Sequence, residues 1–182
     1  MEDYAIVLDY LPDGRKDKPY YKSRPIVLAV GSREFKLFEL YPRKDAIIQL
    51  GDWVYIGKDK EKRKKIYQVK ARVGYDSLTS TAKSELPYIL EEIVKKNEER
   101  FVEFFNESHA LTTRFHMLEL LPGFGKKTLQ LFLKEQKKGP FLSFEDLEKR
   151  VPTLHHPEKV IARRIELELK DPKTKYHLFV RH

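Results

Sequence analysis

The sequence predicts an α+β protein in which a β-rich N-terminal part is followed by a helical C-terminal part. Residues 1–76 contain five short apolar runs bounded by turn residues, with no helical periodicity between them. From residue 77 onward, apolar residues recur every three or four positions, as they do on one face of an amphipathic helix. A Pro-Gly-x-Gly sequence separates two of these helical patterns. We therefore expect three stretches, residues 1–76, 77–108 and 109–182.

The five apolar runs are expected to form the strands of a small barrel. Short strands that follow one another without helices favour a closed or nearly closed barrel, because closure removes exposed sheet edges. An OB-like five-stranded barrel is the first interpretation and an SH3-like barrel is the second. The segment before the last run is then expected to be the tip of a hairpin. The runs cover residues 5–8, 26–30, 35–40, 53–56 and 66–73.

The middle stretch, residues 77–108, is expected to be a helical connector. Thr79 and Thr81 are candidate N-caps. Pro87 suits either the first turn of a new helix or a break in an existing one. From residue 88 to about residue 106, a broad apolar stripe with i, i+4 Glu–Lys pairs predicts one amphipathic helix.

Residues 121–127, Leu-Pro-Gly-Phe-Gly-Lys-Lys, form the most informative segment of the chain, and we call them the glycine hairpin. Apolar residues at helical spacing precede and follow the segment, so the pattern predicts a helix, a tight turn and a second helix. Gly123 and Gly125 allow positive φ and a close approach of the backbone to a partner. A helix that begins after Gly125 directs unpaired N–H groups and the positive end of its dipole toward the turn. With Lys126 and Lys127 beside it, the turn is expected to bind phosphate.

This pattern resembles the helix-hairpin-helix motif over residues 112–138, a module that binds the nucleic-acid backbone without reading its sequence. The alternative is a helical hairpin with a glycine C-cap that binds nothing. On the first interpretation, the residues expected at the nucleic acid are Arg114, Gly123, Phe124, Gly125, Lys126, Lys127 and Thr128.

A second, degenerate hairpin is expected at residues 150–156. The preceding Ser-Phe-Glu-Asp-Leu sequence matches the helix that leads into a second glycine turn in tandem helix-hairpin-helix proteins. Here Thr153 and His155 replace both glycines, so this hairpin is expected to keep a packing role without a close approach to phosphate. Pro157 is expected to begin the last helix, and residues 176–180 are expected to form a final strand.

The net charge of +8 is concentrated in two short segments. Residues 57–65, which we call the basic segment, and residues 110–140 each contain six basic and two acidic residues, and the rest of the chain is neutral. A concentrated excess is typical of a nucleic-acid binder, although a charge run can also be a solvated loop. The candidate contacts in the basic segment are Lys58, Lys60, Lys62, Arg63, Lys64 and Lys65.

The loop at residues 12–24 interleaves basic residues with aromatic ones, a pattern that single-strand-binding barrels use for phosphates and stacked bases. Tyr20, Tyr21 and Lys22 are its candidate contacts. The interpretation that we prefer for this loop is that the tyrosines pack over the barrel mouth and the lysines are solvated. Trp53 is expected in the core.

Composition excludes several classes of protein. The chain contains no cysteine, which excludes disulfides and thiolate metal sites and fits a reducing cytosol. No signal peptide or membrane-spanning run is present, so we expect a cytoplasmic protein without a membrane partner. The six histidines lack zinc spacing, and no Walker-type loop or catalytic triad order is found. No metal, cofactor or enzymatic activity is expected. Abundant Lys, Glu and Tyr indicate a thermophile.

The whole chain resembles the archaeal domain of unknown function 655 family. A barrel-like N-terminal half, an amphipathic connector, Leu-Pro-Gly-x-Gly-Lys-Lys and Ser-Phe-Glu-Asp-Leu carry the resemblance. The resemblance implies an OB-like domain joined to a helix-hairpin-helix domain, an assumed nucleic-acid-binding role, no established reaction and no catalytic residues.

We therefore expect a non-enzymatic protein that binds RNA or DNA without sequence specificity. The alternative is a protein–protein adaptor in a ribosomal or transcription complex. A remote alternative is a DNA glycosylase or lyase, in which Lys127 and Glu145 or Asp146 would take the catalytic positions. Asp146 is better explained as a capping partner of Ser143. The sequence does not specify an oligomeric state.

Overall fold

The structure is a computed structural model of the chain and describes residues 1–17, 19 and 23–182. It is an α+β protein, as predicted, and it divides into two compact units. The first unit consists of Met1–Ile89 together with Glu168–His182, and the second consists of Leu90–Leu167. The candidate contacts Tyr20, Tyr21 and Lys22 lie outside the described residues.

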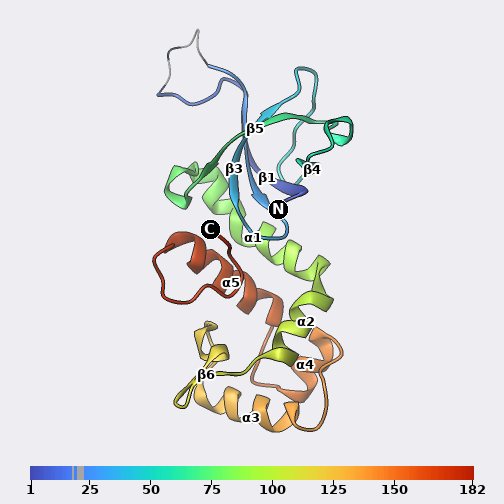
Figure 1. The fold of residues 1–182 in the computed structure, drawn as a ribbon, viewed down its shortest axis with the longest axis vertical. Helices are drawn as coiled ribbons and strands as arrows, with labels where there is room; N and C mark the ends of the chain where they lie inside the picture. The colour runs from blue at the N-terminus through green and yellow to red at the C-terminus, as the bar shows by residue number, and fades with distance from the viewer. Residues whose placement is uncertain (18, 20–22) are drawn as a thin grey trace. The chain divides into compact units, whose positions relative to one another are not determined.

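The first unit contains a curled five-stranded antiparallel sheet (Figure 1). The strand order is β4-β1-β2-β3-β5, in which the first four positions have the 4-1-2-3 order of a Greek key. All five predicted strands are confirmed, four of them with shifted ends. Their bounds are β1 Tyr4–Leu11, β2 Ile26–Gly31, β3 Leu37–Pro42, β4 Trp53–Tyr55 and β5 Ile66–Val73.

The sheet is a half-barrel, because β4 and β5 occupy its two opposite edges and do not pair with each other. The prediction that the basic segment is a hairpin tip is therefore wrong. The segment is a crossover from one edge to the other, and it contains a short 3-10 helix, η2 (Lys60–Lys62). Adjacent strands in the chain need not be adjacent in the sheet when a longer connection lets the second one pair elsewhere.

The core of the first unit includes side chains on both faces of this sheet. Every residue of β2 is buried, and consecutive residues of a strand point to opposite faces. Val7, Val27 and Leu40, together with Ile66, belong to one buried apolar cluster. The pairing of β1 with β2 shifts between Val7 and Asp9, which marks a β-bulge, and such a bulge increases local twist and helps a sheet to curl.

The helices differ in detail from the predicted ones. The single helix predicted over residues 88–106 is two helices, which meet at Asn97, and Pro87 lies inside the first of them. Thr79 caps that first helix, as predicted, by accepting a hydrogen bond from the Ala82 N–H at 3.1 Å. No helix in the described part of the chain is long and apolar enough to cross a membrane. The bounds are η3 Tyr75–Ser77, α1 Ser80–Lys96, α2 Glu98–Glu107, η4 Met117–Leu120, α3 Lys126–Gln136, α4 Phe144–Arg150 and α5 Pro157–Lys170.

The second unit is not all-α, contrary to the prediction. A small two-stranded sheet, formed by β6 (Ala110–Thr112) and β7 (Phe115–His116), precedes the glycine hairpin. The sequence pattern does not indicate this pairing, because strands of two or three residues leave no periodicity to detect.

The predicted final strand at residues 176–180 is also wrong. The carboxylate of Glu168, which is fully buried, accepts hydrogen bonds from the N–H groups of Leu178, Phe179 and Val180 at 2.5, 3.1 and 2.8 Å. One side chain thus satisfies the donors that a strand would have used. The Arg181 N–H donates to the Glu34 carbonyl at 3.3 Å, so the tail is held within the first unit.

Candidate nucleic-acid interface

The turn of the glycine hairpin presents exposed backbone. Gly123 has φ +80°, a conformation that side-chain-bearing residues rarely adopt, whereas Gly125 has φ −75° and ψ 175° and is the N-cap of α3. Only the first glycine therefore uses the positive φ that was expected of both. A Cβ atom built on Gly123 or on Gly125 meets no heavy atom within 4 Å. The backbone at both positions is therefore open to a ligand.

The first turn of α3 lies next to this exposed backbone. Helical bonding begins with the Leu129 N–H, which donates to the Gly125 carbonyl at 2.9 Å, and no side chain caps the N-terminus. The N–H groups of Lys126, Lys127 and Thr128 precede this bond and point out of the helix end. The Phe124 N–H, which was expected to bind phosphate, donates to the Leu121 carbonyl at 3.2 Å inside the turn instead.

The α3 N-terminus is electropositive for two reasons. Lys126 and Lys127 are exposed in its first turn, and this turn contains no acidic residue. The helix dipole adds a partial positive charge at the same end. Cations at a helix N-terminus oppose the dipole, so this arrangement costs helix stability and favours an anion. Among the described residues, no ion pair includes either lysine.

The other faces of the glycine hairpin are buried and hold the turn in place. Leu121, Phe124 and Thr128 are 2%, 5% and 7% exposed, so the Phe124 ring is a core group and is not available for base stacking. The Phe124 ring meets the Phe132 ring edge to face, with centroids 5.8 Å apart. The guanidinium of Arg164, buried in α5, donates to the Leu120 carbonyl at 3.3 Å, just before the turn.

The segment before the turn is a short 3-10 helix, η4, where the sequence predicted a longer helix. The pairing of β6 with β7 uses residues 115–116, and Leu121 precedes a proline, which disfavours helical backbone at that position. His116 caps η4: its Nδ1 accepts from the Leu118 N–H at 3.1 Å, and its own N–H donates to Glu119 at 2.7 Å. Burial lowers the pKa of His116, which keeps the imidazole neutral for this role.

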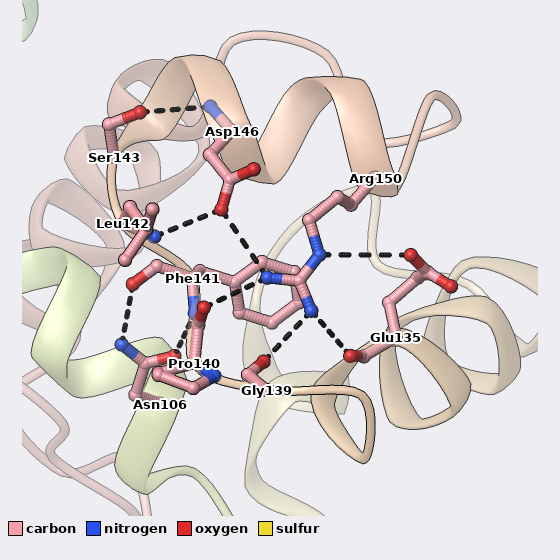
Figure 2. Close-up of polar contacts among 9 residues, drawn as sticks. All are labelled: Asn106, Glu135, Gly139, Pro140, Phe141, Leu142, Ser143, Asp146 and Arg150. Carbon is pink, nitrogen blue, oxygen red and sulfur yellow. Dashed lines mark hydrogen bonds and ion pairs between the residues drawn. The ribbon is translucent and has the colours of Figure 1, made fainter.

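Arg150 at the end of α4 fixes the other end of α3 (Figure 2). Its guanidinium donates to the carbonyls of Glu135, Gly139 and Pro140 at 2.5, 2.8 and 2.9 Å and also contacts the Asp146 carboxylate at 3.3 Å. Arg150 thereby satisfies carbonyls that the end of a helix leaves unpaired.

The ring of Phe141 connects this network to the core of the second unit. The Arg150 guanidinium lies 4.1 Å from the Phe141 ring centroid, and this ring stacks on Phe132 at 5.0 Å. The Asn106 side chain bonds both the N–H and the carbonyl of Phe141, at 2.7 and 2.9 Å (Figure 2). Sequence reasoning missed Arg150 and Arg164, since a charged residue in an amphipathic helix gives no signal that it is engaged with backbone.

The second turn, at residues 151–156, has the same first hydrogen bond as the glycine hairpin. The Leu154 N–H donates to the Val151 carbonyl at 2.9 Å, as Phe124 does to Leu121. The hydroxyl of Thr153, at the position of the missing glycine, is 2.9 Å from the hydroxyl of Thr128 in α3. The second turn therefore contacts the first turn of the helix that follows the glycine hairpin.

Some of the remaining predicted contacts are exposed, whereas others bond within the fold. Arg114 is exposed in the turn between β6 and β7. In the basic segment, Arg63 donates to the carbonyls of Ile56 and Gly57, and Lys65 forms an ion pair with Asp52 at 2.9 Å, so both serve the fold. Lys62 lies 4.0 Å from Asp59. Lys58, Lys60 and Lys64 are exposed.

Within the described residues, no group of three or more histidine or acidic side chains could hold a metal ion. Asp146 accepts hydrogen bonds from the Leu142 N–H and from Arg150, while its own N–H donates to Ser143. Ser143 is thus the N-cap of α4, as predicted, although the Asp146 carboxylate binds the N–H one residue before the cap. Glu145 is exposed and pairs with Lys149 at 3.3 Å.

Comparison with known proteins places this architecture among archaeal relatives. The uncharacterized protein MJ0038 of Methanocaldococcus jannaschii is 49% identical over 182 residues, which cover all of this chain and 81% of that protein. The crystal structure of Af1531 from Archaeoglobus fulgidus superposes with a TM-score of 0.91 at 47% identity, covering 99% of this chain and 100% of that one. The sequence model of the family described as "Protein of unknown function (DUF655)" matches residues 1–181. With a match over nearly its full length and relatives at almost half identity, the chain belongs to the DUF655 family, to which Af1531 is also assigned.

Proposed function

We propose that this protein binds nucleic acid through the sugar–phosphate backbone, without sequence preference, and that the glycine hairpin is the main contact. The observation that carries the proposal is the coincidence of open backbone at Gly123 and Gly125 with the exposed Lys126 and Lys127 at an uncapped helix N-terminus. Backbone N–H groups and lysines are the groups that hold phosphate oxygens. We interpret the arrangement as a helix-hairpin-helix whose first helix is shortened to one 3-10 turn, η4.

The N–H groups assigned to one phosphate are those of Gly123, Gly125, Lys126 and Lys127. The Phe124 N–H is omitted because it bonds within the turn. Arg114 adds charge from the neighbouring β6–β7 turn. Nothing in this contact distinguishes bases, because phosphates carry no sequence information. The proposal includes no chemical step.

The half-barrel extends the footprint through the exposed lysines of the basic segment, Lys58, Lys60 and Lys64. The Greek-key strand order supports an OB-like assignment for this unit, since OB-folds are partly open Greek-key barrels. OB-folds commonly bind oligonucleotides, and this likeness adds support by analogy only.

The test is fluorescence anisotropy of the full chain with short labelled duplex DNA and duplex RNA, across about 50 to 200 mM salt. Each phosphate contact on B-DNA contributes about −0.9 to the slope of log affinity against log salt. The variant Lys126→Glu/Lys127→Glu should flatten the slope by roughly 2 and weaken binding strongly. The control Lys173→Glu/Lys175→Glu makes the same charge change on two exposed lysines of the C-terminal tail.

The comparison between the two double variants decides the assignment. Equal weakening by both would show that net charge, and not the glycine hairpin, governs binding. A wild-type chain that binds neither duplex would exclude backbone binding to duplexes and leave the adaptor function. An adaptor is expected to bind its protein partner without the steep salt dependence of phosphate contacts.

A further inference from the structure

An open groove lies at one end of the sheet in the first unit. It forms where β1 ends, β2 begins, β3 ends and β5 begins, and the pairings Leu11–Ile26 and Pro42–Ile66 place these four ends together. Its volume is about 420 Å³, within the rough range of 300–1,000 Å³ for small-ligand sites. Besides two prolines, the lining residues are Tyr10, Arg24, Arg43, Lys44 and Tyr67.

Among the described residues, the groove combines three cations with two aromatic rings, and none of its lining residues is acidic. Arg24, Arg43 and Lys44 are all exposed. The Arg24 guanidinium lies 4.1 Å above the centroid of the Tyr41 ring, which restricts its position. The two chemical groups that a nucleotide offers, an anionic phosphate and a flat aromatic base, both have counterparts here.

The groove adjoins the basic segment. The Arg43 Nε donates to the Arg63 carbonyl at 2.6 Å, and the Arg43 N–H donates to the Lys65 carbonyl at 2.8 Å. Arg43 is thereby anchored to the residues on either side of Lys64, which is exposed, so the charge of Arg43 is added to that of Lys64. The excess of positive charge in the first unit thus extends from the crossover into the groove.

Tyr67 supplies the stacking surface. It lies on the edge strand β5 and is 56% exposed, which is high for a large aromatic side chain. Tyr10 is half-buried and packs against the apolar cluster of the sheet, so it forms a fixed wall. A base whose faces are free can stack on the exposed Tyr67 ring, in a groove that also holds the Tyr10 wall and several cations.

We infer that this groove binds single-stranded nucleic acid, with an unpaired base stacked on Tyr67 and the adjoining phosphates on Arg43 and Lys44. The inference rests on the proposed nucleic-acid binding and assigns it a second subsite. A duplex does not fit the requirement, because its base faces are covered by neighbouring pairs. Every base has an aromatic face, so the subsite tolerates any sequence. The glycine hairpin would hold backbone, and the groove would hold a strand end or an unpaired stretch.

The experiment uses the full chain and anisotropy with labelled oligo(dT) and oligo(U) of about 12 nucleotides, and with the duplexes used above. The groove variants are Tyr67→Ala, Tyr67→Phe and Lys44→Glu. Tyr88→Ala removes a tyrosine that is 72% exposed on α1, and Lys173→Glu repeats the charge change on the tail. Circular dichroism checks that each variant is folded.

We expect Tyr67→Ala to weaken single-strand binding by about tenfold or more, whereas Tyr67→Phe and both controls stay close to wild type. Lys44→Glu should also weaken it and reduce the salt slope by about 0.7 or more. Duplex binding should be unchanged by Tyr67→Ala. Loss of affinity with either oligomer supports the groove.

The experiments distinguish a wrong assignment of the groove from a wrong assignment of the glycine hairpin. If folded Tyr67→Ala and Lys44→Glu bind single strands as tightly as the wild type, the inference about the groove is wrong. It is also wrong if the wild-type chain binds no single strand. Equal loss of duplex binding in Tyr67→Ala overturns the single-strand assignment. If Lys126→Glu/Lys127→Glu retains duplex binding while Tyr67→Ala loses single-strand binding, the glycine hairpin is not the phosphate site, and the assignment of the groove is supported.

Discussion

The substitution Gly125→Asp separates phosphate binding from stability, because it should raise the free energy of unfolding and weaken the affinity for phosphate. Gly125 has φ −75° and ψ 175°, which any residue adopts, and a Cβ atom there meets no heavy atom within 4 Å. As N-cap of α3, an aspartate would accept a hydrogen bond from Lys127 or Thr128 N–H. Capping adds a few tenths of a kcal/mol over glycine, and the charge at the dipole adds about 0.3–1 kcal/mol. The total is about 0.5–1.5 kcal/mol of stabilisation, or a rise in Tm of a few degrees.

The same carboxylate would occupy the position proposed for phosphate. It would satisfy the N–H groups that the ligand needs and repel an incoming anion. Loss of a charge-assisted contact set costs about 1.5–3 kcal/mol, which corresponds to a roughly 10- to 150-fold weaker affinity. The salt slope on duplex DNA should become less negative by about 0.9. Thermal denaturation measures the first effect and fluorescence anisotropy measures the second.

Gly74→Asp is the matched control. Gly74 is the N-cap of η3 with φ −87° and ψ 167°, and a Cβ atom there also meets nothing within 4 Å. It carries the same change of charge outside the second unit, so it should reduce affinity only slightly. If Gly125→Asp raises Tm and binds duplex as tightly as Gly74→Asp does, the turn is not the phosphate site, and the reasoning from its geometry is refuted.

Three further predictions concern the groups that support the two units. Burial lowers the pKa of His116 below its ordinary 6.5, so the unfolded chain takes up the proton more readily and stability falls as pH drops through about 6.5. His116→Asn keeps an N-cap acceptor and should flatten Tm between about pH 7 and 5, unlike His155→Asn at an exposed position; equal slopes in both variants would contradict this. Arg150→Met leaves three carbonyls uncapped and should lower the free energy of unfolding by about 2–4 kcal/mol in urea titrations. The exposed neighbour Lys149→Met should change it by less than about 0.5 kcal/mol, and similar losses in both would remove the special role of Arg150. Glu168→Gln should speed amide hydrogen exchange at residues 178–180 by about tenfold or more, since a neutral amide binds their N–H groups less strongly; unchanged exchange would show that the tail is held by other contacts.

Much of the fold could be predicted because its signals are local. The five strands are short apolar runs bounded by turn residues, and α4 and α5 begin at the predicted Ser143 cap and Pro157. The start of α3 directly after Gly125 also follows from the Pro-Gly-x-Gly sequence. Each of these depends on the conformational preferences of a few neighbouring residues.

The errors arose where distant residues decide the structure. The basic segment crosses between the two edges of the sheet because β5 pairs with β3, a choice that the local sequence does not contain. The tail does not form a strand because Glu168, ten residues earlier, already binds its N–H groups. In the candidate site, the glycines and lysines were found from sequence, whereas Arg164, which bonds the carbonyl before the turn, was not.

The degenerate second turn explains why only one of the two turns is a candidate for phosphate. In the glycine hairpin the residue with positive φ is Gly123, directly after the proline, whereas in the second turn it is His156, directly before α5. The backbone therefore leaves the two turns along different paths despite their shared first hydrogen bond. The Thr153 hydroxyl, at the position of Gly123, bonds Thr128 in α3. A glycine at position 153 would lose that bond, so the residues that prevent phosphate approach at the second turn also support the helix whose N-terminus would bind phosphate at the first.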